Sequence, residues 1–351
     1  MPHRNKKQRA ESSSLDLASA QTNERSGFCK IPEELTLEIL SYFPSVGPLT
    51  SHHKSSKESS KWDPDPILPR YYLDRPNALR ALSQTCSAYR SIFLPILWDR
   101  LEVCVRAATT TEQFFRHAGL TMIRKCDGLR KNKELASMVK RVHVILTRYK
   151  TDIVLKSFTD CLQDLPNLHT IHILHAHTQM TTVIKDAFEN VTLPTVRTLI
   201  IPGYCHEVLK SCPETRSIRC IRDNGSKLVT VIKSFCKKAE ELRGFDFVSN
   251  PALAKRMVSA APNLRILEVP LEPSDGVMTH LKGIKQLSTI DILWRKDDPP
   301  TLDNPAVVET IKKLRPILLA SPSSEKKYMH LCHRECDRLG GQVTYLDVDL
   351  N

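Results

Sequence analysis

Two groups of histidine and cysteine side chains are the clearest candidates for chemistry in this sequence. One is His330-x-Cys332-His333-x-x-Cys336, and the other comprises His169, His172, His175 and His177. Imidazole and thiolate groups are the usual ligands of zinc, but the first group has no second ligand pair at zinc-finger spacing. The four histidines flank apolar strand positions and do not share one face. We therefore expect no metal site and no cofactor.

The common catalytic motifs are also absent from the sequence. It contains no G-x-S-x-G, no G-x-G-x-x-G and no G-x-x-x-x-G-K-[ST], the signatures of hydrolases, dinucleotide-binding proteins and P-loop enzymes. Only 11 of the 351 residues are glycine, which argues against a glycine-rich loop that cradles phosphate. We expect a protein that is not itself an enzyme.

Charge and composition narrow the choice of partners and compartment. The net charge of +12 is spread along the chain, whereas nucleic-acid binding favours clustered cations; the excess fits solubility better. No apolar run approaches the roughly 20 residues that span a bilayer, and the first 30 residues do not resemble a secretory signal. The 11 cysteines are odd in number and irregularly spaced, which indicates a reducing compartment, cytoplasm or nucleus, without disulfides.

Residues 28–103 form the first predicted domain, after a tail at residues 1–27 that we expect to be disordered. Residues 31–43 begin with Ile31-Pro32-Glu33-Glu34-Leu35 and place apolar side chains at helical spacing. Residues 44–76 are rich in Ser, Lys, His and Pro, which predicts a flexible loop. Helical spacing resumes at residues 78–94, and we expect Pro95 to end that helix.

These segments resemble an F-box in residue type and order. The matching pieces are Ile-Pro-Glu-Glu-Leu and Ile-Leu-Ser-Tyr-Phe within 31–43, Leu-x-x-Leu-Ser-x-Thr-Cys at 79–86 and Leu-Pro-x-Leu-Trp at 94–98. The family usually joins its first two helices in a few residues, so the inserted loop is a departure, and the arrangement is similar to divergent fungal F-box proteins. The resemblance implies that an apolar helical surface docks the Skp adaptor of a ubiquitin ligase, and through it a cullin. The adaptor-binding residues that it implies are Ile31, Pro32, Leu35, Ile39, Leu40, Leu79, Leu82 and Trp98.

A helical connector is predicted at 104–137, and a repeat of the form L-x-x-L-x-L recurs over 138–351. Its copies are Val139/Val142/Val144, Leu168/Ile171/Ile173, Val196/Leu199/Ile201, Thr215/Ile218/Cys220, Leu242/Phe245/Phe247, Leu264/Leu267/Val269, Leu287/Ile290/Ile292 and Val343/Leu346/Val348. Most intervals are close to the roughly 20–29 residues of leucine-rich repeats. The segments between copies are amphipathic helices, including a helical stretch at 305–338. The predicted fold is mixed α/β: a short helical F-box module followed by an irregular, curved leucine-rich-repeat solenoid with parallel strands.

One position of each repeat is predicted to form a row on the inner face of this solenoid. The members with polar side chains that we assign to client binding are His172, Arg219, Asp246, Glu268 and Asp291. Asp246, Glu268 and Asp291 would offer carboxylates to a basic segment of a partner. An equally weighted interpretation is a solvated sheet face with unrelated charges.

Together these features predict a substrate receptor of a Skp–cullin–F-box ubiquitin ligase. The F-box would bind the adaptor and the repeats would hold a protein client, whose identity the sequence does not specify. The alternative is a repeat scaffold for protein–protein interaction in which the F-box-like helices only cap the solenoid. Nucleic-acid binding ranks third.

Overall fold

The computed structural model describes residues 31–47, 68, 70–105, 111–294, 300–334 and 343–350. Its strands form one open sheet of ten members in strict chain order. The strands are β1 (Arg100–Val103), β2 (Arg141–Ile145), β3 (Thr170–His175), β4 (Thr198–Pro202), β5 (Ser217–Ile221), β6 (Glu241–Arg243), β7 (Ile266–Pro270), β8 (Thr289–Trp294), β9 (Tyr328–Arg334) and β10 (Val343–Asp347). β1 to β9 pair in parallel, and β10 pairs with β9 in the antiparallel sense. The predicted mixed α/β class is confirmed.

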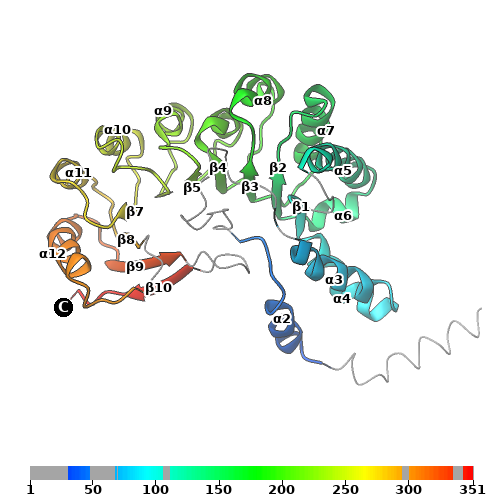
Figure 1. Cartoon of the computed structure of the whole chain (residues 1–351), viewed down its shortest axis with the longest axis horizontal. Coiled ribbons are helices and arrows are strands. Elements are labelled where there is room, and N and C mark those ends of the chain that lie inside the picture. Colours follow the sequence, from blue (N-terminus) through cyan, green and yellow to red (C-terminus); the bar gives the residue numbers. More distant parts are fainter. Residues whose placement is uncertain are drawn as a thin grey trace, which may run out of the picture.

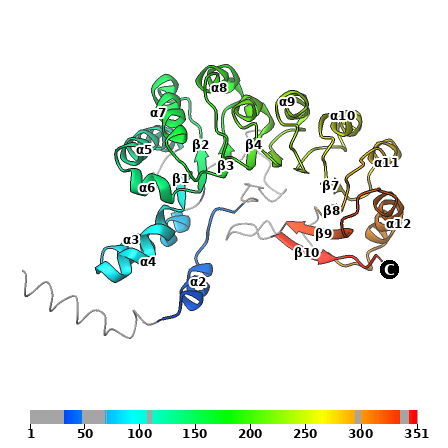
Figure 2. The same ribbon diagram turned by 180° about the vertical axis from the view of Figure 1, so that it is seen from behind.

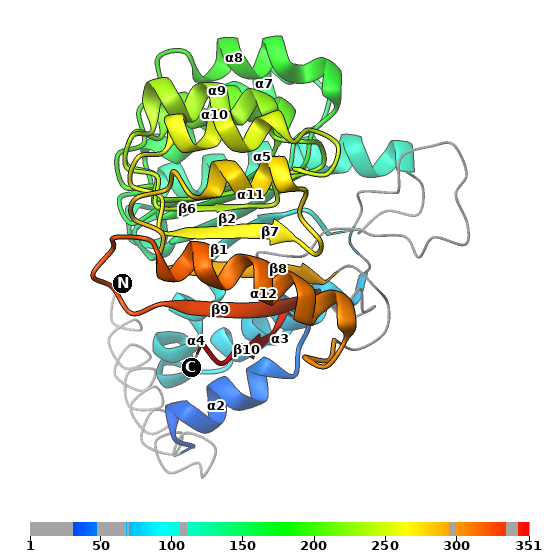
Figure 3. The same cartoon turned by 90° about the vertical axis from the view of Figure 1, so that its left-hand side faces the viewer.

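Helices join successive strands and cover the outer side of the sheet. They are α5 (Thr111–Lys131), α6 (Lys133–Met138), α7 (Thr151–Gln163), η3 (Thr178–Met180), α8 (Thr181–Phe188), η4 (Gly203–Ser211), α9 (Ser226–Phe235), α10 (Ala252–Ala260), α11 (Asp275–Leu281) and α12 (Pro305–Leu319). Figures 1 and 2 show the strands along the inner side of an arc and the helices along its rim. In the end view of Figure 3, β7, β8 and β9 lie nearly parallel, one beneath another.

The arc is held by apolar side chains at one register position of every parallel strand. Strand pairing aligns them, and each is almost completely buried against the helices: Leu101, Val142, Ile171, Leu199, Ile218, Leu242, Leu267, Ile290 and Met329. Residues two positions further on, such as Val144 and Ile173, point the same way because side chains alternate along a strand. A strand–helix unit cannot bury this face alone, so the core forms only when neighbours stack.

A smaller group of helices lies at the β1 end of the arc. It comprises α2 (Glu33–Ser41), η2 (Arg70–Leu73), α3 (Asp74–Ser83) and α4 (Ser87–Trp98). Leu40 of α2, Leu79 of α3 and Phe93 of α4 form a core that is separate from the core of the sheet. α2 lies beside α3 and α4 in the views of Figures 1 and 3.

The local structure of these helices differs from the prediction at three points. η2 and the start of α3 lie within the segment predicted as a flexible loop at 44–76. The predicted helix over 78–94 is two helices, and the Cys86 thiol at the break accepts a hydrogen bond from the Tyr89 amide, which caps α4. Pro95 does not end α4 but lies inside its last turn. Proline has no backbone N–H, so Pro95 cannot donate the helical hydrogen bond to the carbonyl of Ser91, four residues earlier. α4 nevertheless continues to Trp98, because its apolar side chains pack against both cores.

Three expectations about the sheet are wrong. The sheet begins at β1, within the segment predicted to belong to the F-box domain. The segment predicted as helical to residue 338 forms α12 only to Leu319, and β9 then runs from Tyr328 to Arg334. The last predicted repeat, at Val343, is the strand β10, which pairs with β9 in the antiparallel sense instead of continuing the parallel order.

Two glycines provide a matched test of this backbone. Gly244 follows β6 at a φ of +75°, and a side chain there would collide with the carbonyl group of Cys220. Gly128 lies on the exposed side of α5, where an added methyl group meets nothing within 4 Å. We expect Gly244→Ala to lower the free energy of unfolding by more than about 2 kcal/mol, and Gly128→Ala to raise it by about 0.5–1 kcal/mol. Urea unfolding of both variants measures the difference; equal effects would contradict the backbone at Gly244.

Candidate functional site

The inner face of the sheet carries a row of mostly ionisable side chains, one from each strand. Strand pairing aligns Glu102, His143, His172, Ile200, Arg219 and Arg243, and the row continues through Glu268, Asp291, His330 and Asp347. Because the strands follow each other in chain order, residues far apart in the sequence become neighbours across the sheet. The predicted row is therefore present for His172, Arg219, Glu268 and Asp291.

Asp246 is not part of this row, and Arg243 takes the place predicted for it. β6 ends at Arg243, and Gly244 turns the chain away from the sheet. The Asp246 carboxylate instead caps the following turn, where it accepts hydrogen bonds from the Val248 amide at 3.0 Å and the Ser249 hydroxyl at 2.6 Å. The sequence holds a signal for the correct register. If Ala239 rather than Leu242 is taken as the first position of this repeat, its intervals from Thr215 and to Leu264 are almost equal.

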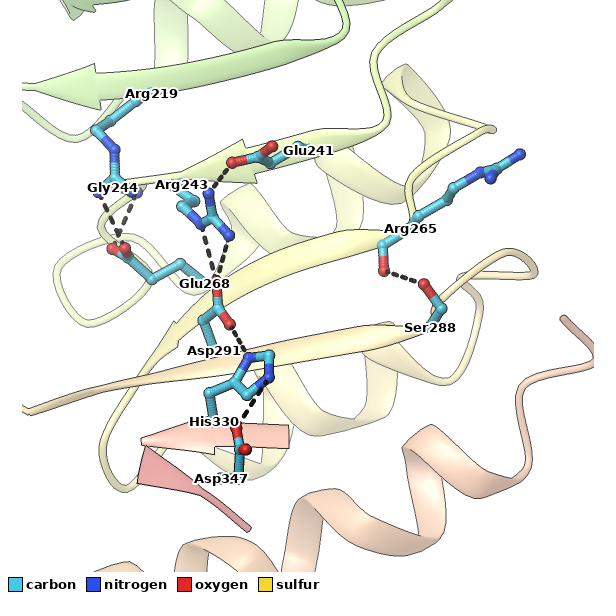
Figure 4. A network of polar contacts seen from close by, with 10 residues as sticks. All are labelled: Arg219, Glu241, Arg243, Gly244, Arg265, Glu268, Ser288, Asp291, His330 and Asp347. Carbon is cyan, nitrogen blue, oxygen red and sulfur yellow. Dashed lines mark hydrogen bonds and ion pairs between the residues drawn. The ribbon is translucent and has the colours of Figure 1, made fainter. Parts of the chain in front are cut away.

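Ion pairs link the second half of the row (Figure 4). Arg219 pairs with Glu268 at 3.2 Å, and Glu268 also accepts the Gly244 amide at 3.1 Å. Arg243 donates to Asp291 from Nε at 2.8 Å and from a terminal nitrogen at 2.7 Å. A guanidinium that donates twice to one carboxylate is a strong, oriented pair.

The chain of contacts ends at the exposed edge of the sheet. Nδ1 of His330 lies 2.9 Å from Asp291, and Nε2 of the same ring lies 3.5 Å from Asp347. Tyr328 stacks on the His330 ring, and Tyr345 meets it edge-on. Both tyrosines and Asp347 are exposed, so this end of the row is accessible to a partner.

The expectation of an open acidic surface is wrong. Asp291 is only 1% exposed and Glu268 is also buried, and each already faces an arginine. Separating either buried carboxylate from its arginine is costly, so Glu268 and Asp291 are held in these pairs and do not form an open acidic surface.

Two buried histidines make up the other polar contact of the row. Nδ1 of His143 lies 3.4 Å from Nδ1 of His172, so one ring donates and the other accepts. Burial lowers the pKa of His172 to about 3, with a smaller contribution from Arg219, and burial next to His172 holds the pKa of His143 well below its usual range. Both rings are therefore neutral at physiological pH. Their Nε2 atoms have no hydrogen-bond partner among the residues that the structure describes.

The two groups of candidate metal ligands are not brought together. In β9, His330 and Cys332 face one side of the sheet and His333 faces the other, because the segment is a strand and not the two helical turns that the spacing suggests. Cys336 lies outside the described residues. His169 contacts Thr170, and His177 accepts the Gln179 amide. Within the described part of the chain, no three His, Cys, Asp or Glu side chains converge as metal ligands.

The predicted adaptor-binding residues divide into a core and a surface. Leu40 and Leu79, at 3% and 2% exposure, are core residues and offer no surface to a partner, which corrects their assignment. Leu82 packs on the same core, and Trp98 packs on the core of the sheet. Leu35 and Ile39 are more than half exposed, Pro32 is exposed and Ile31 is half-buried.

The exposed apolar surface of α2 is wider than the predicted residues alone. Leu37 is 46% exposed and Tyr42, directly after the helix, is 79% exposed. On α4, Ile92 is also exposed. Leu35, Ile39 and Tyr42 follow one another at helical spacing, so they form a ridge on one side of α2. A nine-residue helix that buries Leu40 and leaves this ridge in solvent has an unpartnered apolar face.

Comparison with known proteins adds no assignment to this geometry. No protein-family model matches the chain, and no curated protein matches its sequence. In the described ranges, no helix has both the length and the apolar character needed to cross a membrane. The nine described cysteines are free thiols, and eight of them are buried.

The histidine pair predicts acid sensitivity. Both folded-state pKa values are lowered, so between about pH 6.5 and pH 3 the unfolded chain binds protons that the folded chain does not. The free energy of unfolding then falls as the pH falls, by up to about 1.4 kcal/mol per pH unit for each histidine. We expect His143→Leu/His172→Leu to flatten this dependence when urea unfolding is compared at pH 7.5 and 5.5. The exposed control His177→Gln should keep it; an unchanged slope in the double variant would contradict the argument.

The buried ion pair predicts strong coupling between two residues. Arg243→Leu leaves the Asp291 carboxylate buried without its guanidinium, and we expect it to cost about 3–5 kcal/mol of unfolding free energy. Arg243→Leu/Asp291→Leu should recover most of that loss, because both charges are gone. Asp347→Asn, at the exposed end, should change stability by less than about 0.5 kcal/mol. Additive losses in the double variant, measured by denaturant unfolding, would disprove the coupling.

Proposed function

We propose that this chain is a substrate receptor of a Skp–cullin–F-box ubiquitin ligase, with α2, α3 and α4 as the F-box. The observation that carries the proposal is the apolar ridge of α2, Leu35, Ile39 and Tyr42, which stays in solvent while Leu40 anchors the helix to Leu79 and Phe93. Two separated segments with the residue order of an F-box thus meet in one small core. Their outward apolar face is suited to a helix-in-groove contact with the Skp adaptor.

The repeated strand–helix units are the proposed client-binding part, as an irregular leucine-rich-repeat solenoid. Parallel strands in chain order, an apolar row that faces the helices and a helix or 3₁₀ segment after most strands support this interpretation. The chain itself would perform no bond chemistry. It would act by holding a protein client near a ubiquitin-charged enzyme, which raises the effective concentration of the two reactants. Its place of action would be the cytoplasm or the nucleus.

Client contact is proposed at the β9–β10 end of the inner face. Tyr328 and Tyr345 are exposed and are held beside the His330 ring, and aromatic side chains in fixed positions are frequent energetic centres of interfaces. Asp347 adds an exposed carboxylate at the same edge. His172, Arg219, Glu268 and Asp291 support this face from within the sheet rather than contact the client.

A binding experiment with the purified Skp adaptor tests the proposal. We expect the full chain to bind the adaptor, and Leu35→Asp/Ile39→Asp to reduce the affinity by at least 100-fold, because two charges would enter an apolar contact (about 1.4 kcal/mol per tenfold). Isothermal titration calorimetry gives the dissociation constants. Both side chains are exposed, so the thermal midpoint should remain near that of the wild type.

Val308→Asp is the matched control, because Val308 is 50% exposed on α12, at the far end of the arc. It should bind the adaptor as the wild type does. If the wild-type chain shows no adaptor binding at micromolar concentration, the ligase assignment is wrong and the scaffold interpretation takes its place. Equal binding by the wild type and the Leu35/Ile39 variant would reject α2 as the docking surface.

A further inference from the structure

A cavity of about 320 Å³ lies where the helical module meets the first strand of the sheet. Its walls come from α3 and α4 on one side and from β1 and α5 on the other, which are neighbours in Figures 1 and 2. This volume is at the lower end of the roughly 300–1,000 Å³ of small-molecule sites. It is large enough for a compact solute and too small for a folded partner.

The charges around this cavity are strongly unbalanced. Five cationic side chains line it: Arg75, Arg80, Arg100, Arg124 and Lys125. Glu102 is the one acidic residue among the described lining residues. Asp99, the nearby carboxylate, is engaged by Arg141 at 2.6 Å and lies 3.8 Å from Arg100.

The hydrogen bonds of the cations do not restore the balance. Lys125 donates to the backbone carbonyl of Glu102 at 2.8 Å, and Arg100 reaches the carbonyl of Val46 at 3.5 Å. Both acceptors are neutral. The Nε atom of Arg75 is buried and has no hydrogen-bond partner among the described residues.

Burial makes it costly to hold so many cations beside one carboxylate. It lowers the pKa of Arg75, Arg100 and Lys125, and for Arg100 the neighbouring Arg141 and Arg75 add to the effect, while the nearby Glu102 carboxylate opposes it at all three cations. Desolvated like charges held together are stabilised when a multivalent anion enters among them. The guanidinium groups supply paired donors that match phosphate oxygens, and the Lys125 ammonium supplies a compact point charge.

We propose that this cavity binds a small phosphate-bearing anion with at least two negative charges. Arg75 and Arg100 contact its phosphate oxygens together with the partly buried Lys125, and Arg80 and Arg124 lie at the exposed rim. Because Arg75 belongs to α3 whereas Arg100 and Lys125 belong to β1 and α5, the bound anion joins the helical module to the sheet. The site is independent of the proposed ligase role.

Inorganic pyrophosphate is the first probe, titrated into the full chain in a phosphate-free and sulfate-free buffer. We expect saturable heat and a rise in the thermal midpoint of the wild type. Arg75→Gln/Lys125→Gln should raise the half-saturating concentration at least tenfold, because two of the cations that would hold the anion are gone. The control Lys313→Gln, on α12, should behave as the wild type does.

If Arg75→Gln/Lys125→Gln does not fold, Arg80→Gln/Arg124→Gln replaces it, since both side chains are exposed at the rim; at least a threefold weakening is then expected. Equal pyrophosphate binding by the wild type and either variant overturns the proposal. The proposal is also overturned if no binding is seen when pyrophosphate is in 10-fold molar excess over protein at millimolar concentration.

Vesicles that contain phosphatidic acid test whether a lipid headgroup is the source of the phosphate. Vesicle binding by the wild type that the double variant loses supports the site. Binding of a phosphopeptide or single-stranded RNA without pyrophosphate binding rejects a small-anion site.

Discussion

The apolar row that runs through Val142, Ile171, Leu199 and their counterparts is the interaction on which the rest of the molecule depends. Each side chain is buried only because the strands on both sides place an equivalent residue beside it and a helix covers all three. Shifting one strand by a single residue would move its apolar side chain to the inner face and its polar side chain into the core. The register set by this row therefore also fixes which polar groups meet on the inner face.

The inner-face contacts follow from that register. Arg219 and Glu268, or Arg243 and Asp291, are separated by two strand–helix units in the sequence, yet they pair because each arginine reaches across a neighbouring strand. Buried ion pairs contribute little net stability compared with apolar packing, but a mismatched register would leave them uncompensated. They therefore favour one alignment of β5 to β9 over its alternatives, while the exposed Tyr328, Tyr345 and Asp347 remain available at the edge.

The helical module at the β1 end has a much smaller apolar core than the sheet. Its own buried core is three residues, Leu40, Leu79 and Phe93, and α2 leaves Leu35, Leu37 and Ile39 about half exposed. A core of that size cannot offset the ordering of many residues, so a partner that covers the ridge would stabilise α2 as well as bind it. The cationic cavity between this module and the sheet offers a second way to hold the module in place, through charge rather than apolar contact.

Local patterns in the sequence determined the α/β class and the repeating apolar positions, because apolar periodicity reports directly which side of an element is buried. That Leu35 and Ile39 face outward followed only from the resemblance to an F-box. Local patterns did not determine the register at β6, where Leu242, Phe245 and Phe247 also fit the repeat pattern. They did not determine the direction of β10 either. Both depend on pairing with strands that are distant in the sequence. The pairing of Asp291 with Arg243 and the gathering of Arg75, Arg100 and Lys125 around one cavity were likewise decided only by the tertiary structure. The spacing of charged residues in a sequence does not indicate which of them pair. The packing of strands and helices brings the paired side chains together.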